Sequence, residues 1–338
     1  MKNTHDHYDD VELSPTGESL TLSPESGFSE HFIRVSTTTE VAERQAGAAL
    51  AEDIGPGDLS SAIFDPKQQG AAVLMAKANG VLSGTELATA TFTVIGPGVR
   101  ARWFFKNGDR IKPGDKIAEI SGPVRLMLSA ERVALNFLQH LSGIATLTRK
   151  FVDIAQQSPT KPDIVDTRKT LPMYRAWAKK AVQDGGGKNH RFGLFDMIML
   201  KDNHIDAAGG IKAAMDIVHS EIEEPMPGLG ICIETRNIAE AVEATAAGAT
   251  IVMLDNMTPD QIREGVSAIH AEAERQSINP PLIEISGGVT LETLTDYASL
   301  PVQRISVGAL THSAPALDIS MKYEPLKPVS TKRARQTR

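Results

Sequence analysis

The chain is poor in cysteine and in aromatic residues, and it lacks any long apolar run. Its 338 residues include one cysteine, Cys232, two tryptophans and 5% aromatic residues in all. A lone cysteine cannot form an internal disulfide, which is typical of a reducing compartment, so a cytoplasmic location is expected. No run reaches the roughly 18–20 apolar residues that span a bilayer, and the polar start lacks the apolar core of a signal peptide. We therefore expect no membrane insertion.

Several common signatures of enzymes and of nucleic-acid-binding proteins are also missing. The chain has no G-x-x-x-x-G-K-[ST] phosphate loop, no G-x-G-x-x-G after a strand and no zinc-like set of cysteine and histidine. Its formal net charge is −7, so the surface as a whole is not expected to attract nucleic acid. The basic tail at 327–338 is the exception, and a disordered, solvated end is favoured there over a nucleic-acid contact.

What the chain does contain is an ordinary globular composition, with 41% hydrophobic and 23% charged residues, over a length typical of two domains. Residues 1–37 are polar with little apolar periodicity, which predicts a flexible extension. Residues 38–130 combine a predicted helix at 41–50 with short apolar runs separated by turn signals. This pattern predicts an α+β open-sandwich domain. A further helix is predicted over 129–156, with Gly143 as a candidate break.

Six β-rich runs alternate with helical stretches in the second half of the chain, at 163–167, 197–201, 231–234, 250–255, 282–286 and 304–308. Strands that alternate with helices predict βα units and a parallel sheet. A complete eight-unit barrel usually takes about 250 residues, more than 131–310 provides. The predicted fold class is therefore α/β, with an incomplete barrel of six or seven parallel strands following the N-terminal domain.

Almost every predicted strand of this half ends in polar or charged residues. In α/β barrels the C-terminal strand ends converge on one mouth, where function normally lies. Each residue taken singly is better explained as a helix cap or a turn residue, but six strand ends in register favour a site. The residues at these ends are Asp166, Thr167, Arg168, Lys169, Thr170, Lys201, Asp202, Asn203, His204, Glu234, Asp255, Asn256, Ser286, Gly287, Gly288 and Gly308.

Positive charge is concentrated between Asp166 and His204, where eight basic residues stand beside four acidic ones. A cationic island on an acidic protein indicates a polyanionic small molecule, because guanidinium groups suit carboxylate and phosphate. For Lys179 and Lys180, on a predicted helix, a solvated face is the favoured explanation. The eight residues are Arg168, Lys169, Arg175, Lys179, Lys180, Lys188, Arg191 and Lys201.

Two further patterns concern phosphate and metal. Small residues directly after the last two strands, at 286–288 and 306–308, place backbone N–H groups and a following helix where an anion can bind, although a tight turn explains the first pattern equally well. Glu234 and Asp255 come from different strands and suit Mg²⁺ held jointly with a phosphorylated substrate. Alternatively, they pair with Lys169 or Lys201.

An ordered set of motifs resembles the quinolinate phosphoribosyltransferase family (nicotinate-nucleotide pyrophosphorylase, carboxylating). The motifs are ERVALNFL (131–138), LSGIAT (141–146), DTRKT (166–170), GGGKNHR (185–191), KDNH (201–204), LDN (254–256), ISGG (285–288) and SVGALTHS (306–313). The resemblance covers roughly residues 38–325. It implies an incomplete α/β barrel at 131–310 and an open sandwich at 38–130, which residues 311–326 rejoin.

The resemblance also implies a reaction and an assembly. Quinolinate and phosphoribosyl pyrophosphate (PRPP) would give nicotinate mononucleotide, pyrophosphate and CO₂ in NAD synthesis, with Mg²⁺ as cofactor. The protein would be a homodimer, or a higher oligomer built from it, whose active sites are shared between subunits. Where the family often has a glycine and an aliphatic residue, this chain has Met173 and Tyr174, and Cys232 takes an often acidic place. These departures put the exact shape of the pocket in doubt.

Carried onto matching positions, the resemblance implies a role for each site residue. Arg132 would reach into the neighbouring subunit's site. Four residues would bind the two carboxylates of quinolinate, namely Arg168, His190, Arg191 and Lys201, and Thr167 is a further candidate substrate-binding residue. Lys169, Glu234 and Asp255 are the candidate catalytic residues, the first between the two substrates and the other two at the ribose hydroxyls and Mg²⁺. The 5-phosphate would be held by Ser286, Gly287, Gly288, Ser306 and Gly308.

Three other functions compete with this one. A Schiff-base aldolase on a similar barrel would use Lys201 or Lys169 as its amine nucleophile. A related phosphoribosyltransferase would act on another acceptor. A catalytically silent binding protein is disfavoured, because every charged position of the motif set is present.

Overall fold

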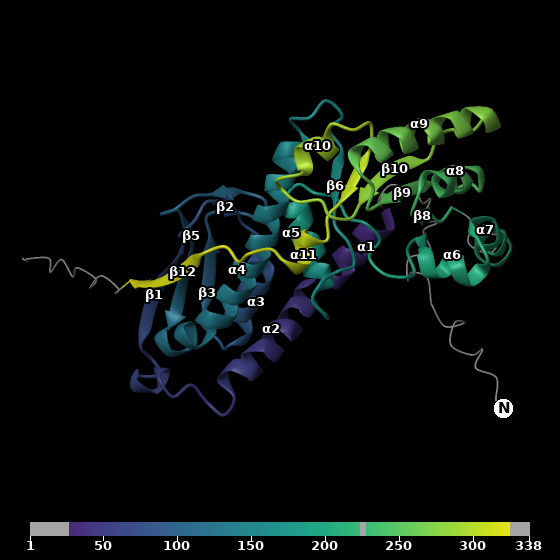
Figure 1. The fold of residues 1–338 in the computed structure, drawn as a ribbon. Coiled ribbons are helices and arrows are strands. Elements are labelled where there is room, and N and C mark those ends of the chain that lie inside the picture. Colours follow the sequence, from purple (N-terminus) through teal and green to yellow (C-terminus); the bar gives the residue numbers. More distant parts are fainter. Residues whose placement is uncertain (1–26, 224–227, 325–338) are drawn as a thin grey trace, which may run out of the picture.

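A single long helix joins the two halves of the fold (Figure 1). The computed structural model describes residues 27–223 and 228–324. Helix α4 (Val124–Ala155) contributes Leu138 to the core of the first domain and Phe151 to the core of the barrel. The break expected at Gly143 is wrong, because the helix runs through it. A Cβ at this position would collide with the carbonyl oxygen of Pro315, so glycine here permits a close approach of the chain.

The first domain is built on a four-stranded antiparallel sheet with the strand order β12-β1-β5-β3. Helices α3 and α4 pack on this sheet, and α2 packs on both helices. A separate two-stranded ladder joins β2 to β4. The elements are α2 (Thr39–Ile54), η1 (Ser61–Ile63), β1 (Gln69–Ala76), β2 (Gly80–Val81), α3 (Thr85–Val94), β3 (Arg100–Trp103), β4 (Arg110–Ile111), β5 (Lys116–Pro123) and β12 (Ile319–Glu324).

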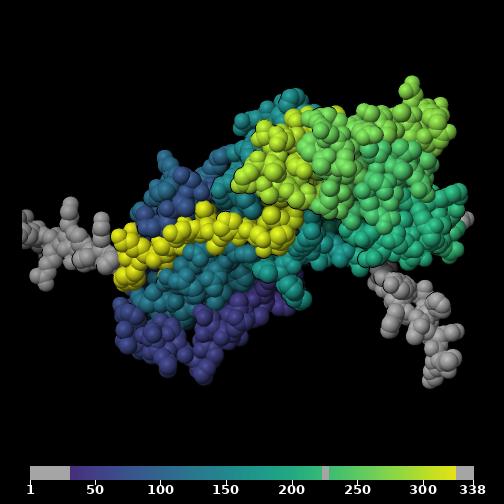
Figure 2. Space-filling model, viewed as in Figure 1, coloured from purple at the N-terminus to yellow at the C-terminus, as the bar shows by residue number. Residues whose placement is uncertain are grey.

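Strand β12 brings the end of the described chain back to the first domain. It runs antiparallel to β1, with Ala76 opposite Ile319 and Ala71 opposite Glu324. Figure 2 shows this C-terminal segment, in yellow, lying across the first domain after leaving the barrel. The limits proposed for the two domains stay a prediction, and the basic tail at 327–338 lies outside the described residues.

Six parallel strands form the second sheet, in the order β6-β11-β10-β9-β8-β7. Strands β6 and β7 are its two edges, and within the described residues no ladder joins them, so the barrel is incomplete. One isolated parallel bridge, between Val165 and Lys188, extends the β6 edge. The predicted α/β fold with an incomplete barrel is therefore confirmed. Its strands are β6 (Asp163–Val165), β7 (Ile198–Leu200), β8 (Ile231–Thr235), β9 (Ile251–Asp255), β10 (Leu282–Ser286) and β11 (Arg304–Ser306).

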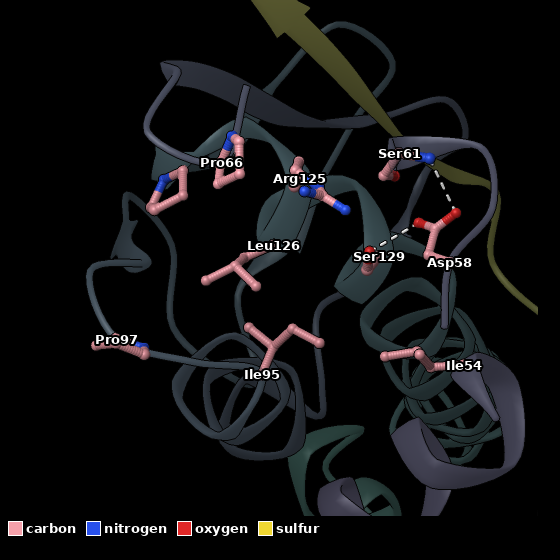
Figure 3. Close-up of a pocket in the computed structure, with 10 residues that line it drawn as sticks. Ile54, Asp58, Ser61, Pro66, Ile95, Pro97, Arg125, Leu126 and Ser129 are labelled. Atoms are coloured by element: carbon pink, nitrogen blue, oxygen red, sulfur yellow. Dashed lines mark hydrogen bonds between the residues drawn. The ribbon is translucent and has the colours of Figure 1, made fainter. Parts of the chain in front are cut away.

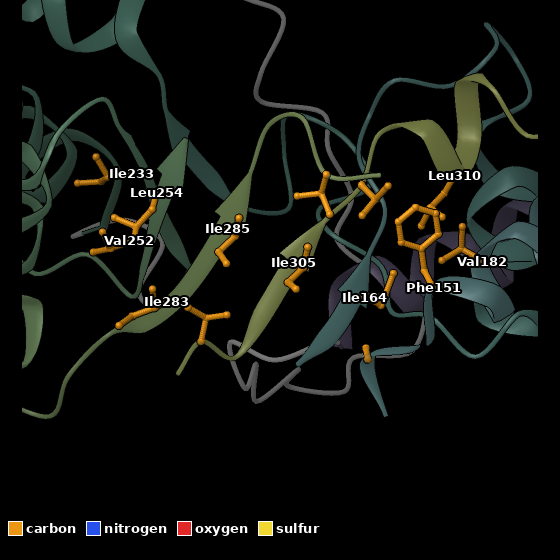
Figure 4. Close-up of a cluster of buried hydrophobic side chains, with 14 of the residues drawn as sticks. Phe151, Ile164, Val182, Ile233, Val252, Leu254, Ile283, Ile285, Ile305 and Leu310 are labelled. Atoms are coloured by element: carbon orange, nitrogen blue, oxygen red, sulfur yellow. The ribbon is translucent and has the colours of Figure 1, made fainter. Parts of the chain in front are cut away.

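Successive side chains along these strands lie alternately outside and inside the barrel. Ile233, Leu254 and Ile285 join the large core between the sheet and the helices that surround it (Figure 4). Each such buried side chain stabilises the fold by about 1.5–3 kcal/mol. Their neighbours along the strands, such as Cys232 and Met253, point to the inside of the barrel and form a smaller cluster. The helices that accompany the barrel are α5 (Arg175–Asp184), α6 (Asp202–Ala208), α7 (Ile211–Val218), η2 (His219–Glu223), α8 (Ile238–Ala246), α9 (Pro259–Gln276), α10 (Leu294–Ala298) and α11 (Ala309–His312).

The expected flexible extension is partly wrong, because its last residues form helix α1 (Gly27–Ser36). Ile33 on this helix is buried, and the Phe32 ring contacts those of Phe192 and Phe195, with centroids 6.1 and 4.5 Å away. Burial of these apolar groups against the barrel domain holds the helix in place. Residues 1–26 lie outside the described part of the chain.

Candidate active site

Side chains from the ends of neighbouring strands meet at one edge of the parallel sheet. Ser286 lies opposite Asp255 in the β9–β10 ladder, and Glu234 is the last residue but one of the neighbouring strand β8. Lys201 follows β7 directly, and its ammonium group is paired with the carboxylate of Glu234. Asp255 accepts a hydrogen bond of 2.7 Å from the amide of Asn256. The structure thus shows the alternative pairing with Lys201 for Glu234 but not for Asp255.

Arg168, which follows β6 by three residues, acts electrostatically on two further guanidinium groups. Burial and the positive charge of Arg168 lower the pKa of both Arg175 and Arg191. Arg191 donates to the carbonyl of Met197 at 3.1 Å, and Arg175 to that of Phe192 at 3.1 Å. The Nε atoms of Arg168 and Arg191 are buried and have no hydrogen-bond acceptor in the part of the chain that the structure describes. Mutually repelling donors of this kind favour an anion between them.

A buried ion pair supports the two segments that carry these arginines. Lys179 on α5 is 0% exposed, and its Nζ donates to Asp166 Oδ1 at 2.5 Å and to the carbonyl of His190 at 2.9 Å. Asp166 also accepts from the backbone N–H of His190 at 2.9 Å and from Asn189 at 2.5 Å. The expectation that Lys179 lies on a solvated face is wrong, because the lysine is buried against Asp166. This partner stands thirteen residues earlier in the chain, so the helical pattern around Lys179 does not reveal it.

Lys180 is also not on a solvated face. Its side chain is part-buried and lies 3.3 Å from carboxylate oxygens of both Glu86 and Asp184. Lys188 pairs with Asp163 at 2.8 Å. These lysines stabilise the fold, so the cationic charge at the mouth comes from the remaining basic residues of the island: Arg168, Lys169, Arg175, Arg191 and Lys201.

The ring of His190 lies under the arginine cluster and is buried. Its Nδ1 accepts the backbone N–H of Arg191 at 2.8 Å, and its Nε2 lies 3.5 Å from Oε1 of Glu284. Burial and the charges of Arg304, Lys179, Arg191 and Lys201 lower the pKa of His190 well below its usual value. The imidazole is therefore neutral at physiological pH and carries its proton on Nε2.

Glu284 and Arg304 were missed by the sequence analysis. Their side chains lie inside the barrel, with Arg304 Nε 3.3 Å from Oε2 of Glu284. The available signal was a glutamate between two isoleucines in a strand that is otherwise apolar, since a buried charge is rare unless it has a partner.

Lys169 is exposed at the rim and lies against the last loop of the barrel. Its backbone N–H donates to Thr167 Oγ1 at 3.1 Å, and its carbonyl accepts from Thr311 at 2.8 Å. A Cβ on Gly308 would lie 3.1 Å from Lys169 Cδ, so the absence of a side chain at Gly308 leaves room for the lysine. The structure therefore brings Lys169 and Gly308 together.

The small residues after the last two strands lie in loops. Gly287 and Gly288 have φ of 89° and 65°, which a residue with a side chain rarely adopts. The helix expected directly after them is absent, since α10 begins only at Leu294, and the helix after Gly308 has four residues. Ser306 is buried, and its hydroxyl donates to the carbonyl of Ile285 at 3.1 Å. Backbone N–H groups, without a long helix behind them, remain as donors at these two loops.

Two features limit what metal the site can hold. Within residues 27–223 and 228–324, no three or more acidic, histidine or cysteine side chains group so as to hold a metal ion. Glu234 and Asp255 are carboxylates at adjacent strand ends, and Mg²⁺ is commonly bound by one or two carboxylates together with substrate phosphates. These residues therefore fit a Mg²⁺ ion that a phosphorylated substrate brings with it.

One predicted site residue, Arg132, is exposed on α4 in the first domain. On the same helix, Arg125, Leu126 and Ser129 line a hollow of about 560 Å³, where Asp58 accepts a hydrogen bond of 2.7 Å from Ser129 (Figure 3). Arg125, Ser129 and Arg132 follow helical spacing, so they share one face of α4.

The departures from the family motifs lie at the rim and inside the barrel. Met173 is 96% exposed, whereas the ring of Tyr174 stacks on Phe137 with centroids 6.3 Å apart. Cys232 is buried among barrel-interior side chains, and burial raises the pKa of its thiol, so it is not a nucleophile.

A parallel α/β barrel whose open end carries clustered arginines, a lysine and two strand-end carboxylates defines an enzyme that acts on anionic small molecules. Two family models match the chain: the N-terminal domain of quinolinate phosphoribosyl transferase over residues 58–142 and its C-terminal domain over residues 144–322. The chain belongs to the quinolinate phosphoribosyltransferase family and is a pentosyltransferase.

Relatives and solved structures agree with this assignment. The chain is 40% identical over 293 residues to quinolinate phosphoribosyltransferase [decarboxylating] 1 of Nicotiana glauca, covering 82% of this chain and 80% of that protein. It is 42% identical over 278 residues to a probable nicotinate-nucleotide pyrophosphorylase [carboxylating] of Bacillus subtilis, covering 80% and 89%. The crystal structure of NadC from Streptococcus pyogenes is 41% identical, covers 86% of this chain and 99% of its own, and has a TM-score of 0.78. In the described part of the chain, no helix is both long and apolar enough to cross a membrane.

Proposed function

We propose that this chain transfers the phosphoribosyl group of PRPP to the nitrogen of quinolinate and releases pyrophosphate and CO₂, which gives nicotinate mononucleotide for NAD synthesis. The observation that carries the proposal is the pair of buried Nε donors on Arg168 and Arg191, which have no acceptor among the described residues. The names of the relatives support the same reaction.

The diacid fits the cationic side of the mouth. Quinolinate carries two adjacent carboxylates. Arg168 and Arg191 offer planar guanidinium groups to them, and Lys201 offers a compact ammonium group. A hydrogen bond to a charged group contributes about 1.5–3 kcal/mol, so three such contacts supply enough free energy to hold a small diacid. Thr167 completes this side, His190 supports it by accepting the backbone N–H of Arg191, and Lys169 lies at the rim between the two substrates.

The sugar phosphate fits the other side of the mouth. We infer that Glu234 and Asp255 bind the ribose hydroxyls and, together with PRPP, a Mg²⁺ ion. The backbone at Ser286, Gly287, Gly288 and Gly308 holds the 5-phosphate. The buried hydroxyl of Ser306 supports this loop from below through its bond to Ile285.

The chemistry follows from how these residues place the two substrates. The bond from the anomeric carbon to pyrophosphate oxygen breaks, the leaving group takes the electron pair, and the pyridine nitrogen forms the new bond to that carbon. Mg²⁺ when bound neutralises charge on the departing pyrophosphate. The cationic nitrogen then stabilises the electron pair left on C2 when CO₂ departs, and C2 takes a proton from water. Catalysis therefore rests on positioning and electrostatics rather than on side-chain acid–base steps.

We further propose a homodimer, or a higher oligomer built from it, in which Arg132 completes the neighbouring site. Its exposure on α4, in the domain that does not carry the cationic mouth, supports an action outside its own subunit. Neither nucleic acid nor a membrane is proposed as a partner. We place the protein in the cytoplasm, where its single thiol stays reduced, although relatives in tobacco and Arabidopsis are named as mitochondrial and chloroplastic.

Mass spectrometry of the product tests the proposal directly. The protein is incubated with PRPP, Mg²⁺ and either quinolinate or nicotinate. Nicotinate mononucleotide and one CO₂ per turnover from quinolinate alone are expected. Product from nicotinate alone would overturn the proposal in favour of a related phosphoribosyltransferase with another acceptor.

A further inference from the structure

Glu284 is a fully buried carboxylate for which the proposed reaction has no direct use. It stands on β10 between Met253 of β9 and Arg304 of β11. Its side chain is 0% exposed. Ser286, two residues further along the strand, lies between it and the mouth, which places Glu284 about 6.6 Å deeper in the barrel. Its two oxygens lie 3.3 Å from Arg304 Nε and 3.5 Å from His190 Nε2.

The hydrogen bonds of His190 fix which of its nitrogens carries the proton. Nδ1 accepts from the backbone N–H of Arg191 at 2.8 Å, so it carries no hydrogen. In a neutral imidazole the hydrogen is then on Nε2, the nitrogen that faces Glu284. The opposite tautomer would set two donors, Nδ1–H and the Arg191 N–H, against each other.

The backbone of His190 is held independently of its ring. Its N–H donates to Asp166 at 2.9 Å, and its carbonyl accepts from Lys179 at 2.9 Å. The ring contacts this segment through Nδ1, which accepts the backbone N–H of Arg191. The ring therefore holds the backbone of Arg191, while the Arg191 guanidinium donates separately to the carbonyl of Met197 at 3.1 Å.

We propose that Glu284 is a positioning residue for the diacid substrate, because it fixes the tautomer of His190 and thereby the backbone that aims Arg191 at the substrate carboxylates. This inference rests on the function proposed above. It gives His190 a role in holding Arg191, in place of the direct contact with quinolinate that the family resemblance implies.

The variant Glu284→Gln tests the proposal with little change in shape. A guanidinium group only donates, so the amide oxygen turns to Arg304 and the amide N–H groups face His190. This favours the tautomer with the proton on Nδ1, which opposes the Arg191 N–H. We expect the KM for quinolinate to rise about tenfold, the ratio that corresponds to about 1.4 kcal/mol, with the KM for PRPP unchanged.

Two further variants separate positioning from folding. In Glu284→Gln/Arg304→Met the amide oxygen is free to accept from Nε2–H, so the KM for quinolinate is expected to return most of the way. The control is Glu272→Gln, a mostly buried carboxylate on α9 that pairs with Arg275 at 2.6 Å, away from the mouth. It is expected to leave both KM values unchanged.

A spectroscopic measurement tests the tautomer without using activity. The ¹⁵N shifts of labelled histidine rings, assigned with a His190→Gln variant, should show the proton on Nε2 in the parent protein and on Nδ1 in Glu284→Gln. A parent ring with Nδ1–H, or a tautomer that Glu284→Gln does not change, would refute the proposal. So would an equal rise of both KM values together with a lower Tm. If quinolinate is not a substrate at all, the proposed function fails, while the tautomer shift still decides whether Glu284 controls His190.

Discussion

Removal of the buried Lys179 ammonium is the most demanding test of how the site is supported. In Lys179→Met the carboxylate of Asp166 stays buried and loses its counter-charge at 2.5 Å, and the His190 carbonyl loses a donor at 2.9 Å. Breaking a buried ion pair by removing one partner costs about 3–5 kcal/mol. We therefore expect a loss of that size in the free energy of unfolding, measured from the urea midpoint at constant slope.

The matched controls for this prediction come from the same chain. Lys212→Met removes an exposed ammonium that pairs with Asp216 at 2.7 Å, and such pairs contribute less than about 1 kcal/mol. The double variant Asp166→Asn/Lys179→Met leaves no unpaired charge at this buried position, so it should be more stable than Lys179→Met alone. A Lys179→Met protein that loses no more than the Lys212→Met control would refute the reasoning.

Three shorter predictions concern the mouth, the partner subunit and pH. Arg168→Ala should raise the KM for quinolinate and lower kcat, because a charge-assisted contact of a few kcal/mol is lost; steady-state kinetics equal to the parent's would remove Arg168 from the site. Arg132→Ala should be an inactive but folded dimer that regains part of its activity when mixed with Arg168→Ala; no recovery after verified subunit exchange would argue against shared sites. Hydrogen bonds from Ser61 and Ser129 lower the pKa of Asp58 from 3.8 to about 2, so the stability they provide is full above pH 3.8 and is lost as pH falls toward 2. Thermal unfolding of Asp58→Asn should lack this part of the acid dependence, and a variant that keeps all of it would contradict the assignment.

The strands and their end residues could be predicted because both signals are local. Five of the six parallel strands fall within a run of residues that the sequence marks, the sixth (β8) extends one residue beyond its run, and polar groups stand at the strand ends. A parallel sheet then brings those ends together whatever the details of packing. The fold class and the placement of polar residues at the strand ends needed no knowledge of distant contacts.

The errors share a different cause, which is partners that are remote in the sequence. Gly143 is a candidate break because glycine is a poor helix former. Only the close approach of the Pro315 carbonyl explains why the helix needs a glycine there. Lys179 stands on a helix, where a lysine is usually solvated. Its burial is explained by the ion pair with Asp166. Glu284 and Arg304 likewise pair although they stand on two different strands. Patterns along the chain do not report such contacts.

Helix α4 is continuous, so it fixes the distance between the two halves of the chain. Arg132 and Gly143 stand on the same uninterrupted rod, so their separation and relative direction are set by residue count alone. One inserted residue between them would turn the arginine by about 100° and shift it by about 1.5 Å relative to its own barrel. The spacing of these eleven steps should therefore tolerate changes of residue type on the exposed side far better than any change of length.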